Sequence, residues 1–93
     1  MKTLQVELFG MARRLAQTKE TSVEIGDDGT YRDVVAALAR RYPAFVDQII
    51  QRDTYELIDP YFLNVDARRV VRDLDEMPEE GKPLLLLFVD AGG

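Results

Sequence analysis

The sequence contains no cysteine and no histidine. Without cysteine, the chain can form no disulfide, no thiolate nucleophile and no cysteine-ligated zinc site. Without histidine, it lacks the commonest general base and metal ligand. Its longest apolar run, residues 84–89, is far too short to span a bilayer, and its first residues lack the apolar stretch of a signal peptide. We therefore expect a cytoplasmic protein without a metal site.

Positive charge is also scarce. The chain has 12 Lys and Arg residues and 17 Asp and Glu residues, which gives a net charge of −5 and a pI near 4.6. Nucleic acids and anionic membranes select clustered Lys and Arg, so neither is an expected partner. A protein with a basic docking surface fits better. The length of 93 residues allows one small domain with a single core, and 46% hydrophobic residues are normal for such a domain.

The first third of the chain alternates between strand and helix patterns. Apolar and polar residues alternate over residues 3–9 and 21–25, which predicts two strands that pair as a hairpin. Between them, residues 11–17 predict a short helix with Met11, Leu15, Ala12 and Ala16 on one side. Phe9 falls at the outward-facing end of the first strand. The side chains expected to face the core from these strands are Leu4, Val6, Leu8, Val23 and Ile25.

The clearest helix is predicted over residues 30–42. Thr30 and Asp33 have the spacing of a capping box, and Pro43 discourages helical geometry in the residue before it. Proline is accepted in the first turn of a helix, so a second, short helix is predicted over residues 44–51. The apolar residues at helical spacing in the main helix are Tyr31, Val34, Val35, Leu38 and Tyr42.

The second half of the chain is less regular until its end. Residues 51–60 fit either a strand or a loop. Residues 61–65 predict a strand, residues 69–72 a short strand that pairs back, and residues 73–80 an acidic loop. Residues 84–89 are apolar on both faces, as expected for a strand in the middle of a sheet.

Together these elements predict an α+β fold, in which a mixed sheet of about four to five strands carries one main helix packed on one face. The final strand would lie centrally, beside the first. We expect residues 1–89 to form this domain and residues 90–93 to form an extended tail that projects from the sheet.

The chain ends in Gly92 and Gly93, directly after Asp90 and Ala91. Glycine has no Cβ, so such a tip could thread a narrow channel. Extended, residues 90–93 reach on the order of 13 Å, far enough to put a terminal carboxylate inside another protein's active site. We expect that carboxylate to be the reactive group. The alternatives are an inert, disordered end and a boundary imposed when the chain was produced.

Four stretches of the sequence form a recognisable series. They are the strand-to-helix opening LFGMARRLA (8–16), the helix start TYRDVV (30–35) with Leu38 and the exit Tyr42-Pro43, the strand end LNV (63–65), and Gly92-Gly93. In this order they resemble the ubiquitin-like β-grasp family of sulfur carriers, and most closely its molybdopterin synthase small-subunit branch. The resemblance covers nearly the whole chain. Thiamine-pathway carriers are similar but usually lack the short helix after the first strand.

The resemblance implies a carrier whose terminal carboxylate holds the cargo. A separate adenylating enzyme of the ubiquitin-activating type would join AMP to the Gly93 carboxylate, using ATP and Mg²⁺. Sulfur transfer would then yield a thiocarboxylate, which a large catalytic subunit would consume in molybdenum cofactor biosynthesis. Gly92 and Ala91 would give access to the partner's channel. The chain itself would bind no cofactor and would not be an enzyme.

A partner of this kind needs a docking surface, which the resemblance places on the exposed face of the sheet. Phe9 matches a family contact position. Independently, the alternation of the first strand places Phe9 among its outward-facing residues, which agrees with a contact role. If Leu86 and Phe88 face the helix, then the alternation leaves Leu85, Leu87 and Val89 on the open face. Exposed apolar patches mark interaction sites. The alternative is that residues 51–60 cover this patch.

The sequence departs from the family in its tail, which lacks the prolines that often precede the small residues, and in the turn before the last strand. These departures leave the pathway open. A thiamine-pathway or tRNA-thiolation carrier, a ubiquitin-like covalent modifier and a plain interaction domain with an inert tail are therefore the alternative readings.

Overall fold

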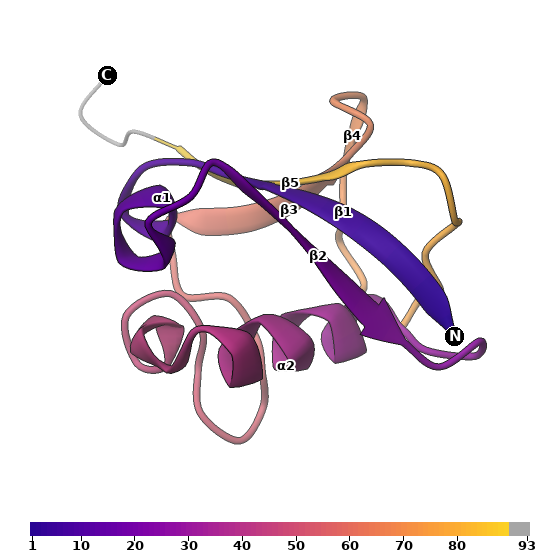
Figure 1. The fold of residues 1–93 in the computed structure, drawn as a ribbon, viewed down its shortest axis with the longest axis horizontal. Helices are drawn as coiled ribbons and strands as arrows, with labels where there is room; N and C mark the ends of the chain where they lie inside the picture. The colour runs from indigo at the N-terminus through magenta and orange to yellow at the C-terminus, as the bar shows by residue number, and fades with distance from the viewer. Residues whose placement is uncertain (90–93) are drawn as a thin grey trace.

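The sheet organises the structure, a computed structural model that describes residues 1–89 (Figure 1). Its five strands lie in the order β2-β1-β5-β3-β4. The strands are β1 (Lys2–Leu8), β2 (Glu20–Ile25), β3 (Tyr61–Val65), β4 (Arg69–Val70) and β5 (Leu84–Phe88). The predicted α+β architecture, with a mixed sheet and one main helix, is confirmed.

Strand β5 occupies the centre of the sheet. It runs parallel to β1, with Leu86 opposite Leu8, and antiparallel to β3, with Leu86 opposite Leu63. Strand β5 is therefore paired along both of its edges, and its two faces differ: Leu84 and Leu86 are buried, whereas Leu85 and Leu87 are partly buried. The predicted hairpin is also present, since β1 and β2 pair antiparallel along their whole length.

The main helix, α2 (Tyr31–Arg41), packs against one face of this sheet (Figure 1). Its start is fixed by the capping box predicted from the sequence: the Asp33 amide donates to Thr30 Oγ1 and the Thr30 amide donates to Asp33 Oδ2. The amides of Tyr31 and Arg32 donate to carbonyls of the acidic loop, at Glu76 and Leu74. The acidic loop therefore also caps the helix.

The core lies between α2 and the sheet. Alternate residues of β1, β3 and β5 point into it and meet one face of the helix, as period-two and period-3.6 patterns require. The largest fully buried side chains are Tyr31, Phe45, Leu4, Leu8, Leu38, Ile49, Ile50, Leu63, Leu84 and Leu86.

The predicted helix over residues 44–51 is wrong. Only a 3-10 turn, η1 (Pro43–Phe45), forms there. The carbonyl of Phe45 accepts from the amides of Ile49 and Ile50, and Asp47 has a φ of 70°, so the chain turns instead of continuing helically. The apolar residues still reach the core, because Ile49 and Ile50 are fully buried.

The short helix α1 (Met11–Ala16) packs on the side predicted for it, except for Met11. Ala12 is its buried residue, whereas Met11 is 37% exposed and Leu15 is partly buried. Within the described residues no helix could cross a membrane, since even α2 has only 11 residues.

Candidate functional site at the end of strand β5

The described chain ends where β5 leaves the sheet. The amide of Val89 donates to the carbonyl of Pro60 at 3.2 Å, so the backbone is held up to this residue. The Val89 side chain is 59% exposed. The expected tail, residues 90–93, with Ala91, Gly92 and the reactive Gly93, lies outside the described residues.

Gly10 lies against the end of β5. Its φ of 60° and ψ of −131° belong to a backbone region used almost only by glycine. A Cβ at this position would lie 2.5 Å from Phe88 Cε1, so glycine also leaves the space that the Phe88 ring fills. Phe88 lies on the same side of the sheet as Leu86, as the sequence predicts, since its partner on β3 is the buried Tyr61. Phe88 has the parity of the buried residues, but it is 44% exposed because it lies past the core, over Gly10.

Tyr61 joins the same corner. Its ring packs against that of Phe88 with centroids 5.6 Å apart. Its hydroxyl accepts from the amide of Ala12 and donates to the carbonyl of Phe9, both at 3.2 Å. One buried side chain from β3 thus ties the start of α1 to the end of β5.

Phe9 stays partly buried beside this corner, under a basic residue of α1. The guanidinium of Arg13 lies 5.3 Å from the centroid of the Phe9 ring, a cation–π distance. Arg13 Nε also donates to the carbonyl of Leu8 at 3.0 Å. Arg13 is exposed, and nothing in its spacing in the sequence indicated this contact.

The face of the sheet opposite α2, here called the open face, carries the other predicted docking residues. Leu85 and Leu87 lie on it, partly buried, and the core residues Leu84 and Leu86 point the other way. Leu87 is opposite Phe62 on β3. The pattern of β5 therefore places the predicted leucines on the same surface.

Sequence reasoning missed three further residues of the open face, because they lie on strands whose own patterns were weak. Phe62, Asn64 and Val70 extend the row from β5 through β3 to β4. Val70 is 39% exposed. The Asn64 Oδ1 atom is buried and, among the described residues, has no hydrogen-bond partner. Once β3 is known to pair with β5, the register of the two strands is enough to place these residues on the open face.

The segment over residues 51–60 does not cover the open face. It lies on the α2 side of the sheet (Figure 1). Arg32 of α2 donates from Nη1 to the carbonyl of Thr54 at 2.6 Å. The alternative that this segment hides the predicted patch is therefore wrong.

The resolved shifts in pKa lie away from the β5 end. A hydrogen bond from Arg32, reinforced by its charge, lowers the pKa of Asp75 below its ordinary value of 3.8. The same pair raises the pKa of Arg32. Residues 1–89 contain no group of acidic, Cys or His side chains placed to hold a metal ion. The described part of the site thus offers packing and docking surfaces.

Comparisons with known proteins bear on the fold. No family model matches the sequence, and no curated protein matches it significantly. Among solved structures, SAMP1 from Haloferax volcanii superposes with a TM-score of 0.82 at 24% identity, covering 98% of this chain and 99% of that one. A putative molybdopterin converting factor, subunit 1, from Pyrococcus furiosus gives 0.73 at 20% identity, covering 92% and 95%.

A third structure, the Amycolatopsis orientalis BexX/CysO complex, contains a chain with a TM-score of 0.75 at 17% identity, covering 97% of this chain and 99% of that one. At these identities the comparisons establish the fold. The chain has the ubiquitin-like β-grasp fold, as the sequence resemblance implied.

Proposed function

We propose that this β-grasp protein is a sulfur carrier whose Gly93 carboxyl group is adenylated and converted to a thiocarboxylate. We further propose that it donates this sulfur in molybdopterin biosynthesis, as the small subunit of molybdopterin synthase. The observation that carries the proposal is the position of β5. The central strand pairs with β1 up to Leu86 and with β3 up to Phe88. Its end is packed by Gly10 and Tyr61, and the Gly92-Gly93 sequence follows within a few residues.

The chemistry explains why a carrier needs a separate enzyme. A carboxylate is a poor acyl donor, so one of its oxygens must first become a leaving group. The Gly93 carboxylate would attack the α-phosphorus of ATP and release pyrophosphate, with Mg²⁺ held by the partner enzyme. Hydrosulfide would then attack the acyl carbon, forming the C–S bond and expelling AMP. This chain supplies the acyl group, and the partner supplies the acid, base and metal.

The open face supports the partner interaction. Phe9, Leu85, Leu87 and Val89 adjoin the end of β5, so a partner that bound them would also receive the chain's end. Residues 90–93 can reach on the order of 13 Å from that point, which suits an active site set back from the docking surface. Among the structural neighbours, the Pyrococcus furiosus protein is described as a molybdopterin converting factor subunit, which favours this pathway.

The test is an intact-mass measurement on the chain ending at Gly93, incubated with its adenylating enzyme, ATP, Mg²⁺ and sodium sulfide. A carrier gains the mass difference between one sulfur and one oxygen. The variant lacking Gly93 should stay unchanged in mass, and its thermal unfolding should match that of the full chain. Unchanged mass of the full chain, with an enzyme of verified activity, would exclude the carrier and leave the covalent modifier or the inert interaction domain.

A covalent modifier is the second candidate. Haloferax volcanii SAMP1 is described as a small archaeal modifier protein, and it has the highest TM-score of the three structures compared. The same adenylate would then pass to a lysine amine of a target, forming an isopeptide bond. Conjugates of higher mass in cell extracts that disappear with the Gly93 deletion would favour this candidate over the carrier.

A further inference from the structure

A small, mostly apolar hollow lies at the edge of β3 where β4 ends. Its volume is about 170 Å³. The hollow, here called the β3 hollow, is lined by Glu56 and Leu57, by residues 61–63 of β3, and by Val71 and Leu74. Of these residues, Glu56 alone is charged.

The shortness of β4 explains why the hollow exists. Strand β4 pairs with Asn64 and Val65 alone, and one further backbone bond joins the amide of Val71 to the carbonyl of Leu63 at 2.9 Å. The chain then turns away into the acidic loop. Among the described residues, no strand therefore covers the outer edge of residues 61–62, and loops flank the space that a longer β4 would fill.

Arg32 fixes both flanking loops to α2. Its amide donates to the carbonyl of Leu74 at 2.8 Å, and its Nε atom donates to Asp75 at 3.0 Å. Its Nη1 atom donates to the carbonyl of Thr54 at 2.6 Å, which holds the loop that carries Leu57. Leu57 and Leu74 are partly buried and pack against the core. The hollow is thus preformed, and an occupant would require little reordering of its walls.

The size of the hollow suits one side chain. An apolar cavity of about 150 Å³ is large enough to bind benzene, so the β3 hollow has room for one side chain the size of leucine or phenylalanine. The charges beside it nearly cancel, because Glu56 and Asp73 are exposed and so is Arg72. Asp75 is paired with Arg32. The hollow therefore favours an uncharged, apolar occupant.

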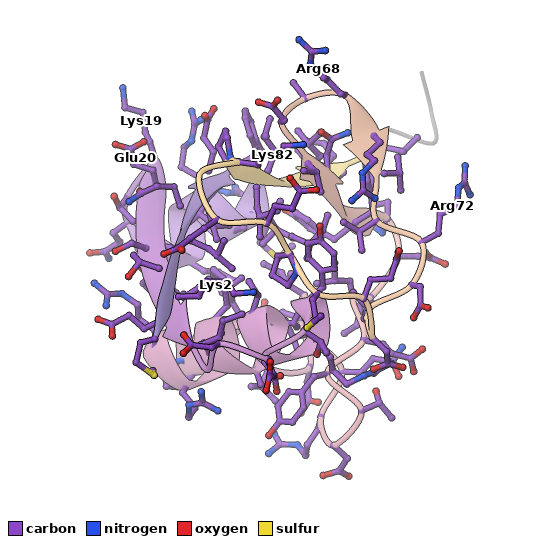
Figure 2. All side chains as sticks on the ribbon, turned by 90° about the vertical axis from the view of Figure 1, so that its right-hand side faces the viewer. Lys2, Lys19, Glu20, Arg68, Arg72 and Lys82 are labelled. Carbon is purple, nitrogen blue, oxygen red and sulfur yellow. The ribbon has the colours of Figure 1, made fainter. Side chains whose placement is uncertain are left out.

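The hollow adjoins the open face. Phe62 lines the hollow and is opposite Leu87, one of the open-face leucines. Arg72, next to Val71 in the sequence, projects on the other side of the molecule from Lys19 and Glu20 (Figure 2). A protein that lies on the open face and extends past β3, away from β2, would therefore reach the hollow.

We propose that the β3 hollow receives one uncharged, apolar side chain, the size of leucine or phenylalanine, from the adenylating enzyme that docks on the open face. The identity of this partner rests on the proposed function, whereas the chemistry of the occupant rests on the lining of the hollow. One anchor in a preformed pocket would set how far the enzyme extends over β3, and it would add specificity to the flatter contacts of Leu85 and Leu87.

The first test needs no partner. N-acetyl-leucinamide is titrated into protein with ¹³C-labelled Leu and Val methyl groups, and N-acetyl-alaninamide is the comparison. We expect saturable methyl shifts at Leu57, Val71 and Leu74 with the leucine compound alone, because the alanine side chain would leave most of the hollow empty. Absence of saturable shifts at these three residues, or shifts confined to Leu85 and Leu87, would overturn the proposal.

The second test measures the affinity of the adenylating enzyme for variants of the chain. Leu74→Asp places a charge in the hollow and should weaken binding at least about tenfold. Leu74→Met keeps the volume and the apolar character, so it should bind as the original chain does. Met77→Asp is the matched control, since Met77 lies in the same loop, is 60% exposed and does not line the hollow. Its affinity should be unchanged.

Leu57→Asp, on the opposite wall, repeats the test should Leu74→Asp fail to fold by circular dichroism. Unchanged affinity in the folded aspartate variants, or an equal loss in Met77→Asp, would overturn the proposal. These outcomes are separate from the proposed function. A chain that takes up no sulfur at Gly93 would contradict that function, whereas the leucinamide titration tests the hollow by itself.

Discussion

The substitution Gly10→Ala tests the packing at the end of β5. Two effects add at this position. Alanine would be strained at the φ of 60° and ψ of −131° of this position, and such strain costs about 1–3 kcal/mol in a non-glycine residue. Its Cβ would also lie 2.5 Å from Phe88 Cε1, and turning the ring off its rotamer costs about 0.5–1.5 kcal/mol. We expect a loss of about 2–4 kcal/mol in the free energy of unfolding.

Two other glycines separate these effects. Gly81 has a φ of 87° but no atom within 4 Å of an added Cβ, so Gly81→Ala should show strain alone, about 1–2 kcal/mol. Gly26 has neither a left-handed φ nor a close neighbour, so Gly26→Ala should change stability by less than about 0.5 kcal/mol. Urea unfolding followed by circular dichroism measures all three at one temperature.

A double-mutant cycle isolates the ring contact. Phe88→Ala should destabilise the Gly10→Ala protein by less than it destabilises the original chain, with a coupling of about 0.5–1.5 kcal/mol, because the ring no longer meets the methyl group. Because Phe88 ends β5, Gly10→Ala should also slow sulfur loading at Gly93 by the partner enzyme. A Gly10→Ala protein as stable as the Gly26→Ala protein would refute the reasoning, and zero coupling would refute the role of Phe88.

The remaining predictions concern the site and its supports. Tyr61→Phe should cost about 1–3 kcal/mol, measured by urea unfolding, because the buried amide of Ala12 loses its acceptor, and a loss below 0.5 kcal/mol would argue against this bond. Leu87→Asp should reduce loading and binding by the adenylating enzyme at least tenfold in a pull-down titration while the protein remains folded by circular dichroism; full loading would remove the open face from the docking surface. Asp75→Asn should lower stability at neutral pH. Since Arg32 lowers the Asp75 pKa below 3.8, the stabilisation exists above that value and is lost as the pH falls through the folded-state pKa. The stabilities of the two proteins should therefore converge in acid, and a gap that persists at pH about 2 would contradict the assignment.

Much of the fold could be predicted from local patterns. The alternation in β1 and β2, the capping box of Thr30 and Asp33, and the apolar faces of β5 each reflect a local rule, and these rules agree with one another. The sequence also predicted a central position for β5, which pairs with β1 along one edge and with β3 along the other.

The failures arose where tertiary contacts decide the structure. Pro43 and the apolar residues after it fit a helix, but the Phe45 carbonyl accepts several amides and turns the chain. Similarly, the contact of Gly10 with Phe88 joins residues far apart in sequence, so no local pattern indicates it.

The most direct test of the central claim is to find where sulfur resides after loading. The chain is incubated with its adenylating enzyme, ATP, Mg²⁺ and sulfide, the enzyme's activity is verified by chain-dependent pyrophosphate exchange, and the product is digested and sequenced by tandem mass spectrometry. The proposed function predicts one sulfur-for-oxygen exchange in the peptide ending at Gly93 and none elsewhere. Active pyrophosphate exchange with no sulfur at Gly93, or sulfur on another peptide, would contradict it.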